Sequence, residues 1–336
     1  MHFALTAEQQ LIAETARGLF AEFAPSLRAT IASDAGYDAD QWRRVTHEMG
    51  FGAIMLPEAA GGAGLGLVEL ALVMIEMGRT LLPSPFLPSI GAALPLLGGM
   101  AEIASGETIA APAIGPDLHL EGDRLSGTVL VPFGHVADLF VAVVDDRAMA
   151  VSAASARVER LTTMDVTRPL ARVRFDGVAV TAVGGAARAL DQARIALAAE
   201  CVGGADAALA ATVDYAKQRI QFGRPIGSFQ ALKHRMADMM VAIEAARTAV
   251  YYAAAAMDED DPAAPEAAAI AHFTAIETYQ MVAGNMIQLH GGIGFTWEHD
   301  AHLHFKRARS AATLFGTPGD SRNRLATLIG LDAQAA

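Results

Sequence analysis

The stretch Arg219–Met240, RIQFGRPIGSFQALKHRMADMM, combines residue types that bind anionic ligands with residues that shape a turn. Its first half contains the turn-forming residues Gly223, Pro225 and Gly227. In its second half, apolar residues recur at helical spacing. The planar guanidinium of an arginine such as Arg219 makes charge-assisted, bidentate hydrogen bonds to phosphate. Spacing alone leaves two interpretations open, a ligand-binding loop or a Gly/Pro turn that carries a surface arginine.

Histidines near the C-terminus are a second set of residues that could do chemistry. His290, His299, His302 and His304 have the donor type of a metal site. On a helix, positions 299 and 302 share a face, but His304 is rotated away from both. The pattern favours packed or solvated histidines, and no metal is expected. The single cysteine, Cys201, excludes an internal disulfide framework and is expected in a helical core.

A glycine cluster at Gly61, Gly62, Gly64 and Gly66 resembles a nucleotide-binding loop only superficially. A G-x-G-x-x-G pattern that starts at Gly62 needs a glycine at position 67, which is Leu67, and no P-loop lysine follows. The cluster favours a structural turn over phosphate binding.

Three segments must position these residues. Residues 1–105 have helical periodicity, with Thr6 and Gln9 as a capping box, and predict an N-terminal α-helical domain. Residues 106–183 contain short β-branched runs separated by Gly, Asp and Pro, which predict a small middle β domain that looks shortened. Residues 184–336 predict four long helices in a C-terminal bundle.

The predicted bundle has glycines inside its first helix and a capping residue at the start of its fourth. The first helix contains Gly203 and Gly204, and interior glycines destabilise a helix unless they allow close packing. The fourth helix is expected near 298–314, with Glu298 as its N-terminal cap.

Composition excludes several classes of function. The 336 residues carry a net charge of −12 and no basic stripe, which argues against a nucleic-acid partner. Hydrophobic residues make up 53%, but no run reaches the roughly eighteen apolar residues of a membrane helix, so no membrane insertion is expected. The N-terminus lacks a basic region followed by an apolar one, and a cytoplasmic protein is expected. We attribute the hydrophobic excess to a large core and an oligomer interface.

Four segments together resemble the acyl-CoA dehydrogenase family. These are LPEAAGGAGLG with Glu76–Gly78, TRPLARVRFDGVAV, QRIQFGRPIGSFQALKHRMADM and QLHGGIGFTWEHDAHLHFKRAR at 288–309. The resemblance covers nearly the whole chain. It implies an α+β, mainly α fold with an N-terminal helical domain, a small middle β domain and a C-terminal four-helix bundle. It also implies an oxidoreductase with FAD as cofactor and an acyl-CoA thioester as substrate.

The resemblance assigns roles to individual residues. In this family the loop after the first bundle helix contacts the ADP half of an FAD that is bound mostly to a neighbouring subunit. Arg219 and Gln221 would face the diphosphate and nearby groups, while Gly223 would let the backbone approach. Arg194 would contact the substrate. The implied cofactor contacts are Arg219, Gln221, Phe222, Gly223, Gln288, Gly291, Gly292 and Thr317.

The catalytic base of the family is missing from both of its usual positions. The family reaction removes the α-proton of an acyl thioester with a carboxylate and passes hydride from the β-carbon to the flavin. In most members a glutamate precedes a Gly-Thr pair, but Phe315 stands before Gly316 and Thr317 here. A second family position lies just before an arginine in the first bundle helix, and here it is Ala193.

Three other carboxylates are weak candidates for the base, which stays unknown from the sequence: Asp191, Glu200 and Glu298. Asp191 is two residues from Ala193 and therefore on a different helix face. The β-domain segment that normally follows APAIGPD and contacts the flavin is not visible either.

These departures resemble the short subunit of heteromeric acyl-CoA dehydrogenases of bacterial sterol side-chain degradation. The resemblance implies a homo- or hetero-tetramer with a longer, base-bearing paralogue, and an electron-acceptor flavoprotein as a further partner. Two alternatives stay open: a non-catalytic subunit that only completes an FAD site, and a homo-oligomeric flavoenzyme with a non-standard base.

Overall fold

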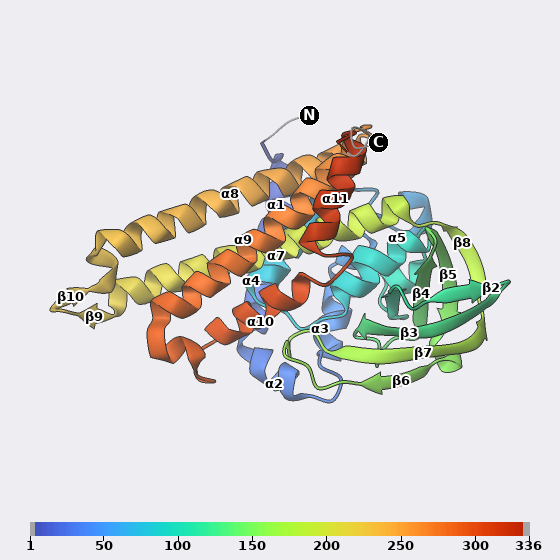
Figure 1. The fold of residues 1–336 in the computed structure, drawn as a ribbon, viewed down its shortest axis with the longest axis horizontal. Coiled ribbons are helices and arrows are strands. Elements are labelled where there is room, and N and C mark those ends of the chain that lie inside the picture. The colour runs from blue at the N-terminus through green and yellow to red at the C-terminus, as the bar shows by residue number, and fades with distance from the viewer. Residues whose placement is uncertain (1–3, 332–336) are drawn as a thin grey trace. The chain divides into compact units, whose positions relative to one another are not determined.

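The computed structural model describes residues 4–331, which fold into two compact units. Unit 1 contains residues up to 24, residues 71–82 and residues from 197 onward; unit 2 contains residues 25–70 and 83–196. Figure 1 labels the helices and strands of both. The mainly helical α+β composition agrees with the predicted fold class.

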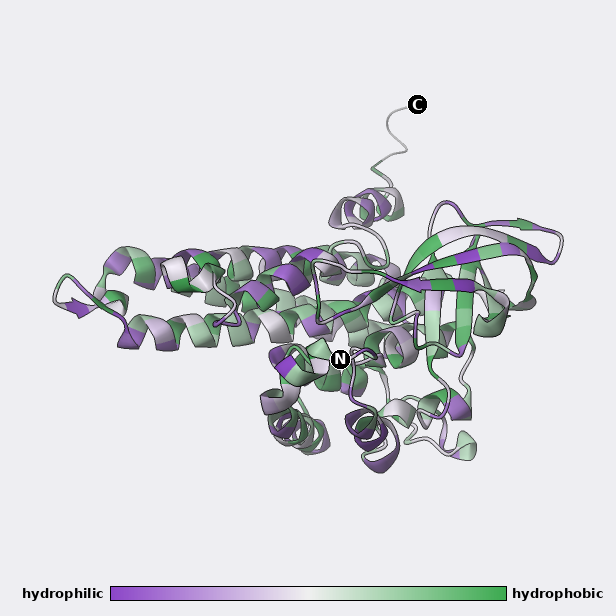
Figure 2. Cartoon of the chain, turned by 90° about the horizontal axis from the view of Figure 1, so that it is seen from below, coloured by the Kyte–Doolittle hydropathy of each residue, from purple (hydrophilic) through white to green (hydrophobic). Residues whose placement is uncertain are grey.

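Unit 1 is a helical bundle. Figure 2 shows hydrophobic stretches along its long helices, interrupted by hydrophilic positions. The helices α4 and α7 begin in unit 2 and continue into unit 1. The bounds of the elements are α1 Ala7–Phe23, α4 Leu67–Arg79, α7 Ala187–Gln218, β9 Ile220–Gln221, β10 Arg224–Pro225, α8 Gln230–Asp258, α9 Ala264–His290, α10 Ala301–Ala311 and α11 Pro318–Leu328.

Local signals explain where several of these helices start. The predicted capping box is present, because the Thr6 side chain accepts from the Gln9 backbone and the Gln9 side chain accepts from the Thr6 backbone. Helix α11 differs from the expectation of four bundle helices: Thr317 and Asp320 form a second capping box, with proline at the first helical position.

The prediction that Glu298 caps the fourth helix is wrong. Helix α10 begins at Ala301, and Glu298 lies in the exposed turn before it. The backbone N–H of Ala301 instead donates to the imidazole Nδ1 of His299, 3.1 Å away. The histidine ring therefore satisfies one of the donors that a helix start leaves open.

Glycines bring α4 and α7 into backbone contact within unit 1. A Cβ on Gly203 would lie 1.8 Å from the carbonyl oxygen of Ile75, and one on Gly78 would lie 2.0 Å from that of Glu200. A Cβ on Gly204 would meet the Tyr279 ring at 2.5 Å. These contacts confirm that Gly203 and Gly204 serve close packing.

A ladder of charges joins four helices of unit 1. Glu76 of α4 is 4% exposed; it accepts a hydrogen bond from Arg17 of α1 at 2.8 Å and forms an ion pair with Arg79 at 3.1 Å. Asp206 of α7 pairs with Arg79 and, at 2.9 Å, with Arg247 of α8. The pairing matters because a buried carboxylate without partners would destabilise the bundle.

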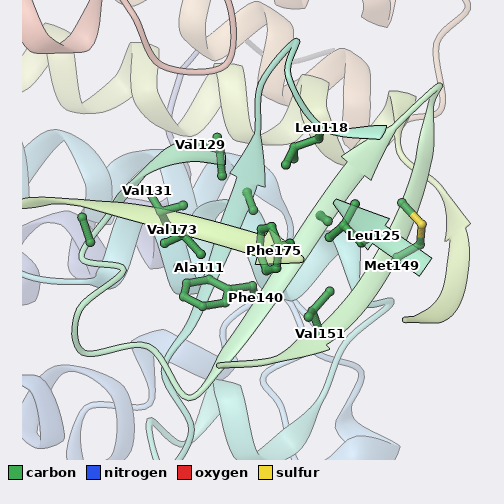
Figure 3. Close-up of a cluster of buried hydrophobic side chains, with 13 residues drawn as sticks. Ala111, Leu118, Leu125, Val129, Val131, Phe140, Met149, Val151, Val173 and Phe175 are labelled. Carbon is green, nitrogen blue, oxygen red and sulfur yellow. The ribbon is translucent and has the colours of Figure 1, made fainter. Parts of the chain in front are cut away.

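Unit 2 contains short helices and two four-stranded sheets, with the orders β1-β4-β5-β8 and β2-β3-β7-β6. Strands β1 and β4 are parallel, and the other pairs are antiparallel. Figure 3 shows the buried cluster of hydrophobic side chains from both sheets, in which Phe140 and Phe175 meet edge to face. The bounds are α2 Leu27–Ala32, α3 Ala39–Arg43, α5 Leu94–Leu96, α6 Ala101–Ala104, β1 Ala110–Ile114, β2 His119–Glu121, β3 Arg124–Pro132, β4 Leu139–Val144, β5 Arg147–Ser152, β6 Arg157–Arg160, β7 Leu170–Ala179 and β8 Thr181–Gly185.

One helix among residues 4–331, α7, is long and apolar enough to cross a membrane, but 78% of its apolar window is buried inside the fold. Burial of this kind is also found in the core helix of a protein that crosses no membrane, so the length of α7 is weak evidence for a membrane span.

We predict that Gly203→Ala destabilises the fold although alanine is the better helix former. The added methyl group collides with the backbone of α4, and overpacking typically costs about 1–3 kcal/mol. Gly18→Ala is the matched control, because Gly18 lies in the exposed part of α1 with nothing within 4 Å of a Cβ. It should stabilise by up to about 1 kcal/mol. Urea unfolding measures both, and equal stability of the two variants would contradict the close contact.

Candidate functional site

The loop after α7 forms a two-stranded hairpin, β9–β10, at one end of the unit 1 bundle (Figure 1). Its turn residues Phe222 and Gly223 have φ values of +54° and +75°. Positive φ at both central positions matches the right-handed twist of a two-residue hairpin, but it is unusual for phenylalanine. The turn leaves the Phe222 ring 91% exposed.

Aromatic contacts hold the hairpin against the start of α8. The guanidinium carbon of Arg224 lies 4.0 Å from the centre of the Phe229 ring, and Phe222 meets Phe229 edge to face at 6.1 Å. Residues Arg219, Gln221 and Phe222 remain exposed to a ligand or a partner.

A ring stack joins the end of α7 to the end of α9. Tyr215 stacks on His290 at a centroid distance of 4.4 Å, and His299 covers His290 at 4.4 Å with a tilt of 52°. The Nδ1 of His290 lies 2.8 Å from the carbonyl oxygen of Met286. Burial lowers the pKa of His290, so the ring in the middle of the stack is neutral at pH 7.

This stack brings together most of the predicted cofactor residues. The hairpin follows Tyr215, while Gln288, Gly291 and Gly292 flank or follow His290 at the end of α9. A Cβ on Gly223, Gly291 or Gly292 would meet nothing within 4 Å, so a ligand can approach the backbone at all three. Arginine and amide groups for a diphosphate, exposed rings and open glycine backbone fit the ADP half of FAD.

Thr317 is the predicted cofactor residue that lies outside this cluster. Its hydroxyl caps α11. It accepts a hydrogen bond from the Asp320 backbone N–H at 3.1 Å and donates one to the Asp320 carboxylate at 2.7 Å. In Figure 1, α11 lies away from the β9–β10 hairpin along the bundle. One copy of the chain therefore does not gather all eight residues around one ligand.

The two positions of the family base are buried and apolar. Ala193 is fully buried, and Phe315 is 8% exposed with a φ of +57°. A left-handed φ strains a phenylalanine, and such strain is often found in functional loops. Neither side chain can accept a proton.

The nearby carboxylates are paired with arginines. In unit 2, the Asp191 carboxylate accepts a hydrogen bond at 2.8 Å from Arg194, which lies one turn further along α7. In unit 1, Glu200 lies 2.8 Å from Arg307, and both side chains are at most 7% exposed. Both carboxylates are therefore engaged in ion pairs. Arg307 could not be found from the sequence, since no local pattern indicates a partner so distant in the chain.

The histidines near α10 have packing roles. Among the described residues, no group of histidine, cysteine and carboxylate side chains could hold a metal ion. His304 is buried, and its Nδ1 lies 3.0 Å from the hydroxyl of Tyr279. Cys201 is buried, as the sequence predicts.

Comparisons with known proteins identify the family. The family model for the acyl-CoA dehydrogenase N-terminal domain matches residues 6–103, and that for the C-terminal domain matches residues 183–329. The chain belongs to the acyl-CoA dehydrogenase family, which confirms the predicted fold, the oxidoreductase class and FAD as the cofactor.

Particular relatives agree with the steroid-type resemblance. The chain is 41% identical to acyl-CoA dehydrogenase IpdE2 of Mycobacterium tuberculosis, covering 95% of this chain and 96% of the relative. It is 37% identical to IpdE2 of Mycolicibacterium smegmatis, covering 96% and 98%. Among solved structures, the Tcur3481-Tcur3483 steroid ACAD matches with a TM-score of 0.89 at 32% identity, covering 98% and 99%. The ChsE4-ChsE5 complex from Mycobacterium tuberculosis matches with a TM-score of 0.89 at 27% identity, covering 100% of both chains.

We predict that His304 makes the fold less stable as the pH falls. Burial lowers the pKa of His304 to about 4, against an ordinary value of 6.5. The unfolded chain therefore takes up a proton below pH 6.5 while the folded chain does not. The contribution of uncharged His304 to the free energy of unfolding is complete above pH 6.5 and is lost as the pH falls towards 4. The loss amounts to about 2 kcal/mol at pH 5.

The measurement is urea unfolding of the wild type and His304→Gln at pH 7.5 and pH 5. Glutamine keeps a partner for the Tyr279 hydroxyl but does not titrate. The variant should lose less stability between the two pH values. Equal losses in both proteins would show that His304 does not cause the pH dependence.

Proposed function

We propose that this chain is the base-lacking subunit of a two-chain, FAD-dependent acyl-CoA dehydrogenase that acts on a steroid-derived acyl-CoA. The observation that carries the proposal is Phe315 beside Gly316 and Thr317, where the family places a glutamate. Ala193 at the second family position and the arginine-paired Asp191 and Glu200 support it. A longer paralogue would supply the base.

The reaction itself explains why two chains would be needed. α,β-Desaturation needs a positioned carboxylate to take the α-proton, which typically contributes about 10²–10⁴-fold to the rate. FAD, when bound, would supply the acceptor for the hydride of the β-carbon. In this proposal Arg219, Gln221 and Gln288 hold the ADP half of an FAD shared with the partner, Phe222 covers it, and Thr317 contributes to a second shared site. Arg194 contacts the substrate.

The surface of the bundle supports a partner chain. Met240 and Val241 of α8 are 59% and 70% exposed, and Phe222 at the hairpin tip is 91% exposed. Exposed apolar groups of this kind are typical of interaction sites. We propose a hetero-tetramer in the cytoplasm that is reoxidised by an electron-acceptor flavoprotein. The solved ChsE4-ChsE5 complex and the Tcur3481-Tcur3483 steroid ACAD, each with two named components, support the heteromeric form.

The chain alone should be a poor dehydrogenase, and the partner should restore turnover. The test is co-expression with the longer paralogue, followed by flavin stoichiometry and dye reduction with a steroid-derived acyl-CoA. Substituting the glutamate that the partner carries before its own Gly-Thr pair should abolish turnover without loss of flavin. Ordinary turnover by this chain alone would instead support the homo-oligomeric alternative, and full turnover by the partner alone would make this chain non-catalytic.

Arg219→Ala should weaken FAD retention by the assembled enzyme. A hydrogen bond to a charged group contributes about 1.5–3 kcal/mol, which corresponds to roughly tenfold to a hundredfold in affinity. The matched control is Arg157→Ala, since Arg157 is an exposed arginine of β6 in unit 2. Flavin release is followed by fluorescence during dilution. Equal retention in both variants would remove Arg219 from the cofactor site.

A further inference from the structure

A buried histidine of α9, His272, contacts the chain at both ends of residues 314–317, which we call the Gly-Thr loop. Its side chain is 0% exposed. The Nε2 atom lies 3.3 Å from the carbonyl oxygen of Leu314, at the start of the loop. The Nδ1 atom lies 2.8 Å from the hydroxyl oxygen of Ser321, in the first turn of α11. One ring therefore joins α9 to the segments on either side of the loop, all within unit 1.

The acceptor at Leu314 determines which nitrogen of His272 carries a proton. A carbonyl oxygen only accepts, so Nε2 must donate to Leu314. In the neutral ring Nδ1 is then an acceptor, and the hydroxyl of Ser321 donates to it. Ser321 is 3% exposed, so it cannot reach a substrate as a nucleophile in spite of its contact with a histidine. The pair can hold the backbone in place but cannot perform chemistry on a substrate.

The Gly-Thr loop has a backbone shape that must be held by its surroundings. Phe315 has a φ of +57° and Gly316 a φ of +102°. Phenylalanine seldom adopts a left-handed φ, and such a conformation persists only where neighbouring contacts determine it. The bond from His272 to Leu314 fixes the residue before this turn. The capping box of Thr317 fixes the residue after it.

We propose that His272 is a positioning residue, which holds the Gly-Thr loop in the shape that it presents to the shared cofactor site. The inference rests on the proposed function, because that function supplies the shared site. The hydroxyl of Thr317 already accepts and donates hydrogen bonds within its capping box. The backbone around Thr317 therefore decides where this residue meets a ligand, and His272 sets that backbone from inside the bundle.

Two amide variants separate the two contacts of His272. The side chain of His272→Gln extends as far as Nε2 and can still donate to Leu314. The side chain of His272→Asn extends only as far as Nδ1 and keeps a partner for Ser321 alone. His272→Gln should therefore hold the loop like the wild type, whereas His272→Asn should release it.

Backbone amide exchange of the chain alone measures the loop directly. Deuterium uptake by the peptide that covers residues 312–317 is followed by mass spectrometry. It should become roughly threefold to tenfold faster in His272→Asn, the factor that a neutral hydrogen bond typically contributes, and stay unchanged in His272→Gln. Equal uptake rates in the two variants would overturn the proposal.

Arg322→Ala is the matched control for the packing of α11 on α9. Arg322 also joins the two helices, through an ion pair with Glu277 and a contact with the Phe273 ring at 4.7 Å. Neither contact involves the Gly-Thr loop, so uptake by residues 312–317 should stay as in the wild type. Uptake that rises as much as in His272→Asn would show that the packing of α11, and not the histidine, holds the loop.

A measurement on the wild-type chain needs no folded variant. The ¹⁵N NMR shifts of a histidine side chain distinguish its two neutral tautomers, and His272 should carry a proton on Nε2. A proton on Nδ1 alone would leave Leu314 without its donor and would overturn the proposal.

Flavin retention by the two-chain enzyme tests the consequence for the cofactor site. Well below the unfolding temperature of both variants, His272→Asn should lose flavin roughly threefold to tenfold more readily than His272→Gln. Equal retention would overturn the positioning role. A wild-type assembly that binds no flavin would contradict the proposed function and with it the role at the shared site, whereas equal amide exchange would contradict the hold on the loop alone.

Discussion

A buried ion pair between Glu200 of α7 and Arg307 of α10 limits the chemistry that this chain can perform. A carboxylate removed from water needs a cation to remain charged, and removing one partner of such a pair costs several kcal/mol. Glu200 is therefore committed to the packing of the bundle. Asp191 is held in the same way by Arg194 in unit 2. Phe315 and Ala193 occupy the family's base positions, and neither side chain can accept a proton.

Close helix packing makes the same bundle a rigid support for the β9–β10 hairpin. Glycines let the backbones of α4 and α7 touch, and the Glu76 ladder joins α1, α4, α7 and α8. The end of α7 is then fixed to the end of α9 through the Tyr215–His290 stack. Residues far apart in the sequence thus meet at one end of the bundle, where the exposed hairpin presents Arg219 and Phe222.

Much of this could be predicted from sequence because the determining signals are local. Hydrophobic periodicity, the Thr6–Gln9 capping box and the interior glycines of α7 each act within a few residues. The absence of a glutamate before the Gly-Thr pair is visible in the sequence itself, where Phe315 stands, and the loss of the base stays a prediction. The predicted N-terminal cap at Glu298 was wrong because the side chain of the neighbouring His299 accepts the hydrogen bond at the helix start instead. Helix α11 was missed because Thr317 was assigned to the cofactor and not to the capping box it forms.

What could not be predicted depends on contacts between distant segments. The partner of Glu200 is Arg307, and neither residue has a local pattern that indicates a buried pair. The hydrogen bonds of His272 likewise require α9 and α11 to be placed together. The domain boundaries, which rest on residue patterns, and the individual cofactor contacts, which rest on the family resemblance, remain predictions.

The central claim is that this chain has no base for the α-proton, and isotope exchange at the α-carbon tests it most directly. The chain, supplied with excess FAD, is incubated with an acyl-CoA in D₂O, and deuterium at the α-carbon is followed by mass spectrometry. Exchange should be no faster than in buffer for this chain alone and should become fast once the base-bearing partner is added. Fast exchange by this chain alone would contradict the account, because a proton acceptor would then exist within it.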